Sequence, residues 1–207
     1  SLKFFENNAA LDLSKLECEL IRVREGSGET FVCINGFLCQ NMLDEKYWIT
    51  PIVDKNKDPD IYILKWESKK LEDIGNYFMK IGMKQLVKKI IARSIGGGWI
   101  LFLDLFNDFI KFPWFQALAA SKFVVEKFSK ELLISGKNLE NITLLGHSLG
   151  ARIVHGTLNK LHDMNARVKE AYLFGAAISG ADEDDSWKKA YGGVKREIYN
   201  YHSQNDY

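Results

Sequence analysis

The chain has 207 residues, 46% hydrophobic and 27% charged, which is enough for one globular domain with a sizeable core. Its formal net charge is +1 and no basic stripe stands out, so a nucleic-acid partner is not expected. Three cysteines without metal-ligand spacing indicate reduced thiols, and the polar first ten residues are unlike a signal peptide. We therefore expect an intracellular protein, in the cytoplasm or at a membrane and not evidently secreted, with no metal site.

The first part of the chain is predicted to form strands followed by a long helix. Residues 17–24 alternate in polarity and lead into a Gly-Ser-Gly turn, which predicts an N-terminal edge hairpin over about residues 15–35. Its second strand, residues 31–34, is apolar throughout, as in a strand covered on both faces. Residues 60–66 predict another strand, and apolar residues at helical spacing predict a helix over 71–91.

A helical insert over about residues 96–135 is predicted next. Trp99–Phe112 is almost wholly apolar, which fits either a helix buried against the sheet or a lid or membrane-facing element over an acyl-binding cleft. A spanning helix is disfavoured because the run is short and contains two aspartates. Pro113 suits the first turn of a new helix, which we expect to end near Ser135, before Gly136.

The second half of the chain alternates between strands and helices. Strands are expected at residues 141–145, 171–174 and 197–201, with a helix after the first of them and a short helix around Trp187. This alternation predicts a single α/β domain over residues 1–207, of the α/β-hydrolase type, with a mainly parallel sheet and helices on both faces. Such sheets carry their active groups at the carboxyl ends of the strands.

The sequence Gly-His-Ser-Leu-Gly at residues 146–150 is the most informative motif. It has the form G-x-S-x-G between a predicted strand and a predicted helix, which is the context of a nucleophile elbow. A side chain at Gly146 or Gly150 would collide with a neighbouring element at so tight a turn. The motif predicts that Ser148 is a catalytic nucleophile.

An oxyanion formed by attack of a serine needs hydrogen-bond donors aimed at it. One predicted donor is the backbone N–H of Leu149, the residue after the nucleophile. The second is expected from Asn35-Gly36-Phe37, which follows an earlier strand. There Gly36 would allow a close backbone approach, and the N–H of Phe37 would be the donor.

The sequence offers a candidate for the catalytic acid but no histidine at the expected position of the base. Asp206 follows the last predicted strand and has the expected chain order for the acid, but no histidine follows it. His147, His155 and His162 lie in the elbow or on the helix after it, and His202 precedes the acid as the least unfavourable candidate base. We therefore expect the base, with a final strand and helix, to lie outside this sequence.

Several segments resemble domain-of-unknown-function family 726, an α/β-hydrolase group that includes eukaryotic transmembrane and coiled-coil domain proteins. The matching segments are Asn35-Gly36-Phe37, Leu64-Lys65-Trp66-Glu67-Ser68, Pro113-Trp114, Ile142 to Val154, Leu173-Phe174-Gly175-Ala176, Trp187 and Ile198 to Asp206. The resemblance implies a serine hydrolase fold, often membrane-associated, with lipase-like or esterase activity. By matching position it implies Ser148 as nucleophile and Asp206 as acid, and it offers no matching histidine.

Three functions remain open at this point. The first is a serine hydrolase that acts on a small-molecule or lipid acyl ester through an acyl-enzyme, with no cofactor and with possible peripheral membrane contact through Trp99–Phe112. The second is a catalytically incomplete α/β-hydrolase-fold module that binds a partner or a membrane. The third, transfer of the acyl group to an acceptor other than water, uses the same residues as the first.

Overall fold

The computed structural model describes residues 18–36, 46–66, 120–176, 178 and 184–201. All of them belong to one compact unit, Glu17–Trp66 with Ala120–Tyr207. The other unit, Ser1–Leu16 with Glu67–Ala119, lies outside the described residues, and so do the predicted helix at 71–91 and the apolar run at 99–112.

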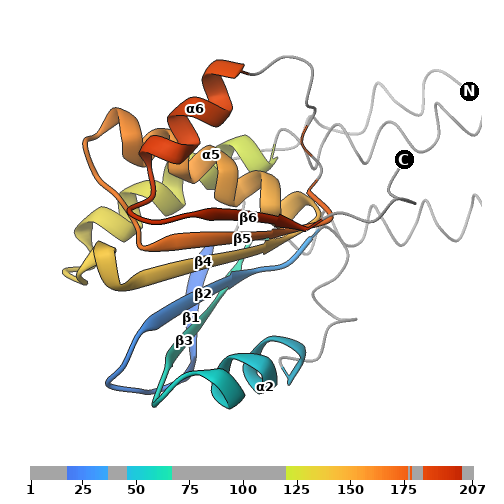
Figure 1. Ribbon diagram of the computed structural model, residues 1–207, viewed down its shortest axis with the longest axis vertical. Coiled ribbons are helices and arrows are strands. Elements are labelled where there is room, and N and C mark those ends of the chain that lie inside the picture. The colour runs from blue at the N-terminus through green and yellow to red at the C-terminus, as the bar shows by residue number, and fades with distance from the viewer. Residues whose placement is uncertain (1–17, 37–45, 67–119, 177, 179–183, 202–207) are drawn as a thin grey trace, which may run out of the picture. The chain divides into compact units, whose positions relative to one another are not determined.

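A six-stranded sheet runs through the described unit (Figure 1). Its strands are β1 (Glu19–Arg24), β2 (Thr30–Ile34), β3 (Asp60–Lys65), β4 (Ile142–His147), β5 (Glu170–Phe174) and β6 (Ile198–Tyr201). Their order in the sheet is β1-β3-β2-β4-β5-β6. Only the β1–β3 pairing is antiparallel, and the other four pairings are parallel. The predicted α/β class with a mainly parallel sheet is confirmed.

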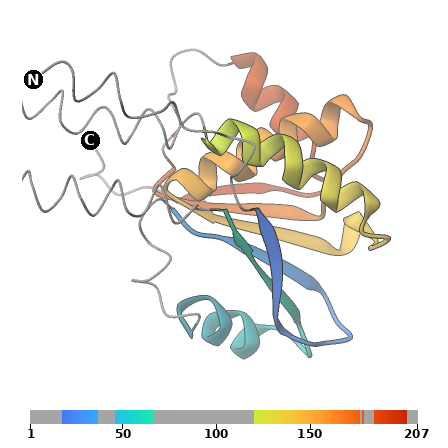
Figure 2. The same ribbon diagram turned by 180° about the vertical axis from the view of Figure 1, so that it is seen from behind.

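Helices lie on both faces of this sheet, as predicted (Figures 1 and 2). One face carries α2 (Lys46–Lys55), and the other carries α5 (Leu149–Asp163), with α6 (Asp184–Gly192) packed on α5. The strand β2 lies between them and is buried along its whole length. Its alternate residues Phe31 and Cys33 pack in a cluster with Ile52 of α2, which leaves Val32 and Ile34 on the opposite face.

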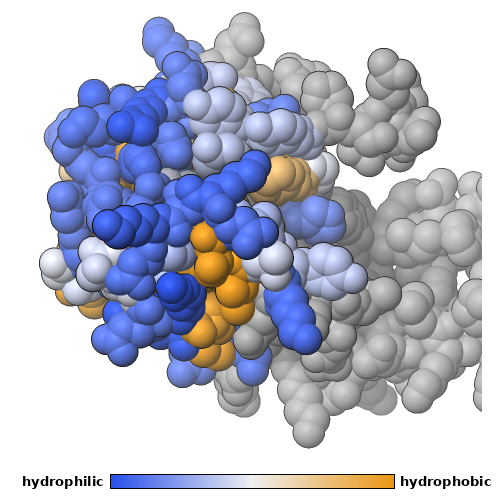
Figure 3. Space-filling model, turned by 60° about the horizontal axis from the view of Figure 1, so that its bottom comes forward, coloured by the Kyte–Doolittle hydropathy of each residue, from blue (hydrophilic) through white to orange (hydrophobic). Residues whose placement is uncertain are grey.

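The helix α2 was not predicted from the sequence. Pro51 lies inside it, and an internal proline removes one helical hydrogen bond and normally argues against a helix. The helix is held instead by tertiary packing, because Ile52 is buried while Tyr47 and Val53 remain exposed. With the lower side of Figure 1 turned forward, the described surface is mostly hydrophilic, and its most prominent hydrophobic area lies in the lower middle of the view (Figure 3).

The predicted hairpin over residues 15–35 is wrong, because β1 pairs with β3 and not with β2. The glycine-rich turn instead packs on the chain that leads into β3. A Cβ atom on Gly26 would lie 2.4 Å from the backbone oxygens of Asp58 and Pro59. The backbone N–H and the hydroxyl of Ser27 donate hydrogen bonds of 2.9 and 2.8 Å to the Asp58 carboxylate. These contacts place β3 between the two strands that the sequence had suggested as partners.

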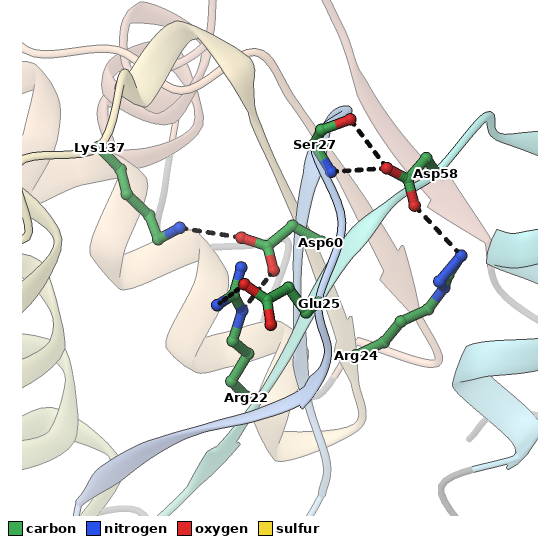
Figure 4. Close-up of polar contacts among 7 residues, drawn as sticks. All are labelled: Arg22, Arg24, Glu25, Ser27, Asp58, Asp60 and Lys137. Carbon is green, nitrogen blue, oxygen red and sulfur yellow. Dashed lines mark hydrogen bonds and ion pairs between the residues drawn. The ribbon is translucent and has the colours of Figure 1, made fainter.

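A buried carboxylate joins the amino end of β3 to its neighbours (Figure 4). Asp60, whose side chain is 5% exposed, accepts hydrogen bonds from Arg22 Nε of β1 at 2.8 Å and from Lys137 Nζ at 3.0 Å. Burial alone would raise the pKa of Asp60, but the hydrogen bonds and charges of Arg22 and Lys137 outweigh it, and the pKa is lowered. The network stabilises the end of the sheet opposite to the elbow.

Residues 120–134 form a helix, so the last part of the predicted insert belongs to the same compact unit as the sheet. The helix buries one face, whose residues repeat every fourth position: Ala120, Val124, Phe128 and Leu132. The predicted end of this helix near Ser135 is confirmed. Gly136 has a φ of 69°, the left-handed conformation that commonly follows the end of a helix.

Candidate active site

Ser148 occupies the sharp turn between β4 and α5. Its φ of 54° and ψ of −119° lie outside the regions that non-glycine residues normally adopt. Although it stands at the N-cap position of α5, its side chain makes no capping hydrogen bond. Its backbone N–H donates to the carbonyl of Phe174 at 2.9 Å, and its carbonyl accepts from the N–H of Ala151 at 3.1 Å. The backbone is thus held in a strained conformation, and the hydroxyl does not serve as a helix cap.

Both glycines of the motif are required by close approach of the backbone. A Cβ atom on Gly146 would lie 2.6 Å from the backbone nitrogen of Ala151, in the first turn of α5. One on Gly150 would lie 2.1 Å from the carbonyl oxygen of Ile34, at the end of β2. Real Cβ contacts are never so short, so any larger residue would displace α5 from the ends of the strands.

Gly36 lies directly against the serine. In the sheet register Ile34 pairs with Gly146, so the chain leaving β2 passes beside the elbow. A Cβ atom on Gly36 would lie 2.9 Å from the Cβ and 3.4 Å from the Oγ of Ser148. Leu149 is the first residue of α5, and the N–H of a first helical residue has no acceptor within its own helix. Phe37, the other predicted donor, lies outside the described residues.

Two tryptophans hold the residue before Gly36. The Nε1–H of Trp48 in α2 donates to the side-chain oxygen of Asn35 at 2.6 Å. The Nε1–H of Trp66, just after β3, donates to the backbone oxygen of Asn35 at 2.9 Å, in a fully buried contact. Sequence reasoning missed this arrangement, since the three residues are far apart in the chain and only the fold brings them together.

An aromatic row lines the carboxyl ends of the strands next to the elbow. Phe174 pairs with His147 in the sheet register, and its ring lies 6.1 Å from that of Trp48, centroid to centroid. On its other side Phe174 stacks on Tyr201 of β6, with centroids 5.3 Å apart and planes 13° apart. The backbone of Phe174 lies beside the elbow, because its carbonyl oxygen accepts the hydrogen bond from the N–H of Ser148.

The predicted acid Asp206 and the candidate base His202 lie outside the described residues. Two of the described histidines make other contacts on α5. The ring of His155 packs on Trp187, with centroids 4.6 Å apart, and burial lowers its pKa to about 4, with the charge of Arg152 adding to the effect. The ring of His162 packs closely on Gly192, because a Cβ atom added to this glycine would lie 2.3 Å from Nδ1 of His162. The structure therefore brings together Ser148, Leu149 and Gly36. His147 precedes the serine in the chain, but its Nδ1 is buried and has no hydrogen-bond partner within the described part of the chain.

The described thiols and acidic groups form no other centre. Within the described ranges, no group of three histidine, cysteine or acidic side chains could hold a metal ion. Cys18 and Cys33 are free thiols, and burial is the main cause that raises the pKa of both, that of Cys18 to about 11. Neither thiol has the lowered pKa of a reactive cysteine.

The fold and this geometry define an α/β protein with a serine on a strained strand-to-helix turn at the carboxyl ends of parallel strands. The family model described as "Protein of unknown function (DUF726)" matches residues 12–207, and the chain therefore belongs to this family.

Several curated proteins are similar to the chain. It is 26% identical over 159 residues to "Uncharacterized membrane protein C6F6.13c" of Schizosaccharomyces pombe, a match that covers 72% of this chain and 20% of that protein. It is 23% identical over 158 residues to "Uncharacterized membrane protein F35D11.3" of Caenorhabditis elegans, covering 70% and 25%. It is 27% identical over 190 residues to "Transmembrane and coiled-coil domain-containing protein STS1" of Oryza sativa, covering 85% and 28%. The chain thus spans between a fifth and just over a quarter of the length of these relatives.

One solved structure, "The structure of Francisella virulence factor BioJ", matches with a TM-score of 0.34 and 12% identity, over 90% of this chain and 56% of that one. A likeness this weak carries no argument about function. Although the relatives are named as membrane proteins, none of the helices in the described ranges is long and apolar enough to span a bilayer.

Proposed function

We propose that this chain is a serine hydrolase of the esterase or lipase type, with Ser148 as its nucleophile. The observation that carries the proposal is the backbone of Ser148, a non-glycine residue at φ 54° between β4 and α5. Strain of this kind persists where the surrounding structure enforces it, and it is the geometry that exposes a nucleophilic serine in a G-x-S-x-G turn. Here the enforcing contacts are the close approaches at Gly36, Gly146 and Gly150.

In the proposed reaction the Ser148 oxygen attacks the carbonyl carbon of an ester while a histidine base takes the hydroxyl proton. The negative charge that develops on the carbonyl oxygen is stabilised by the N–H groups of Leu149 and Phe37. The alcohol then leaves with the proton from the histidine, and water hydrolyses the acyl-enzyme. Asp206 orients the base. Neither a metal nor an organic cofactor takes part in these steps.

An acyl ester, including that of a lipid, is the substrate class that we propose. The row of Trp48, Phe174 and Tyr201 offers aromatic surface near the carboxyl ends of β5 and β6, and an acyl chain requires apolar surface of this kind. A membrane location, which we also propose, would bring such substrates to the site, and Trp99–Phe112 is the segment that we expect to contact the bilayer surface. If an alcohol replaced water in the second step, the same residues would carry out acyl transfer.

Labelling with a fluorescent fluorophosphonate tests the proposal, because the probe reacts covalently with activated serines. In the full-length protein the wild type should be labelled and Ser148→Ala should not, whereas the 207-residue chain alone should be labelled weakly or not at all, because its base is expected outside it. Ser186→Ala is a matched control, because its hydroxyl lies 3.5 Å from His155 Nε2 but is not on the elbow. Equal labelling of wild type and Ser148→Ala would refute the role of Ser148. Loss of labelling in His202→Ala, with the fold intact, would identify the base.

The alternative is a catalytically incomplete module that binds a partner or a membrane. It is favoured by one observation, that His155 and His162 on the elbow helix are engaged in contacts away from the serine. This alternative predicts no labelling of the wild type together with binding to vesicles. The hydrolase predicts labelling that depends on Ser148.

A further inference from the structure

One peptide group joins the elbow to the end of β6, the strand beside β5 in the sheet (Figure 1). It is the peptide group between Phe174 and Gly175. Its carbonyl oxygen accepts from the N–H of Ser148 at 2.9 Å, and its own N–H donates to the carbonyl oxygen of Tyr201 at 2.8 Å. A peptide group is planar and rigid, so it fixes the backbone of Tyr201, the last residue of β6, relative to the serine.

The side chains of β5 and β6 reinforce this link at the same position. Phe174 and Tyr201 are paired in the parallel register of the two strands. Their rings stack, with centroids 5.3 Å apart and planes 13° apart. Such stacking is favourable beyond the burial of the ring surfaces. The side chain of Tyr201 is nevertheless 53% exposed, so burial in the core is not the reason for a large ring at the end of β6.

A second pair of rings on the same two strands provides a comparison. Tyr172 and Tyr199 stack with centroids 4.7 Å apart and planes 18° apart. They precede Phe174 and Tyr201 by two positions in each strand, so both pairs lie on the same face of the sheet. Phe174 is paired with His147, the residue before Ser148, whereas Tyr172 lies two positions further from the elbow. Of the two pairs, that of Phe174 and Tyr201 is the nearer to the serine.

The segment that the proposed reaction requires begins directly after this stack. Asp206, the proposed acid, follows Tyr201 by five residues in the sequence, and His202 follows it by one. Five residues of extended chain span at most about 18 Å, so the position of Tyr201 limits where the Asp206 carboxylate can lie. An acid orients a catalytic imidazole only when both are held in place relative to the nucleophile. The stack on Phe174 restrains the start of this segment.

We propose that Tyr201 is a positioning residue for the acid: by stacking on Phe174, its ring holds the end of β6 at the elbow, so that Asp206 can orient the base. The inference rests on the proposed hydrolase function and adds to it a residue that acts through Asp206. The aromatic ring carries this role and the hydroxyl group does not, because the partner ring of Phe174 has no polar group. Tyr201→Phe should therefore react like the wild type.

The test measures how fast diisopropyl fluorophosphate modifies the full-length protein, because this small reagent has no long acyl chain to bind along the aromatic row. We expect Tyr201→Ala to slow the reaction about tenfold, since small displacements of catalytic groups are costly. Tyr199→Ala is the matched control: it removes the other stacked ring of β6 and should react at the wild-type rate. Urea midpoints of both variants show whether the fold is retained.

A double-mutant cycle with Asp206→Asn separates positioning of the acid from a general effect on the fold. If Tyr201 acts through Asp206, Tyr201→Ala should change the rate by less than about twofold once Asp206→Asn is present. The same slowing with and without Asp206→Asn, or equal slowing by Tyr199→Ala or by Tyr201→Phe, would overturn the inference and leave the hydrolase intact. A wild type that does not react, or that reacts no faster than Ser148→Ala, would refute the proposed function and this inference with it.

Discussion

The indole nitrogen of Trp48 donates a 2.6 Å hydrogen bond to the side-chain oxygen of Asn35, which links α2 to the chain leaving β2. The next residue, Gly36, is the one that lies against Ser148. A second indole, that of Trp66, fixes the backbone oxygen of Asn35. The backbone beside the serine is therefore held through both the side chain and the main chain of Asn35, and we expect the positions of the proposed oxyanion donors to depend on these two indole hydrogen bonds.

Replacement of Trp48 by Phe should reduce reaction at the serine more than it reduces stability. The change keeps an aromatic ring beside Phe174 but removes the N–H, a net loss of about 1 kcal/mol. Because small displacements of catalytic groups are costly, we expect fluorophosphonate labelling to slow by about tenfold. Trp187→Phe, on α6, is the control and should label at the wild-type rate. If both variants label equally fast, Asn35 does not position the site.

Gly36→Ala should damage the elbow directly. The added methyl group would lie 2.9 Å from Ser148 Cβ and 3.1 Å from the carbonyl oxygen of His147, so one of the two backbones must move. Overpacking of this kind costs about 1–3 kcal/mol, and we expect labelling to be lost. Gly136→Ala is the control: its Cβ would meet no atom within 4 Å, and its φ of 69° alone should cost about 1–2 kcal/mol. Wild-type labelling by Gly36→Ala, measured beside urea unfolding, would contradict the proposed geometry.

The contribution of Asp60 to stability should disappear in acid. Its pKa is lower in the folded chain than in the unfolded chain, so the stabilisation is present above the unfolded value near 4 and is lost as the pH falls through the folded value. Asp60→Asn should therefore lower the urea midpoint at neutral pH and flatten its dependence below about pH 4. Asp54→Asn, at an exposed position of α2, should keep the wild-type acid profile. An unchanged profile in Asp60→Asn would show that the ion pairs with Arg22 and Lys137 add no stability.

Local patterns in the sequence were sufficient for several elements. The run of apolar residues in β2 and the strand–glycine–helix pattern around Ser148 depend on neighbours in the chain, and both were predicted near their observed bounds. The partner of β1 was not predictable in this way. A Gly-Ser-Gly turn usually joins adjacent strands, but here it packs on Asp58 and Pro59, which follow some thirty residues later.

The candidate site likewise contains residues whose roles could be predicted from local sequence and residues whose roles could not. The roles of the elbow glycines could be predicted from the local sequence, because they follow from the turn itself. Trp48 and Trp66, which donate hydrogen bonds to Asn35, follow it in the chain by 13 and 31 positions. No spacing in the sequence indicates these hydrogen bonds. The contact between the rings of His155 and Trp187 likewise joins α5 to α6, and no spacing in the sequence indicates it. Contacts of this kind depend on packing geometry, which a pattern of polar and apolar residues does not contain.

His155 should make the protein less stable in mildly acidic solution, over a pH range that lies above the one in which Asp60 acts. Burial and the charge of Arg152 lower its pKa from 6.5 to about 4, so between these values the unfolded chain binds a proton that the folded chain does not. The stability is therefore highest above pH 6.5 and falls as the pH is lowered toward 4, by on the order of 3 kcal/mol. His155→Gln should remove this part of the pH dependence of the urea midpoint, while His162→Gln should retain it. A His155→Gln profile that still follows the wild type between pH 6.5 and 4 would mean that the imidazole protonates in the folded protein without cost.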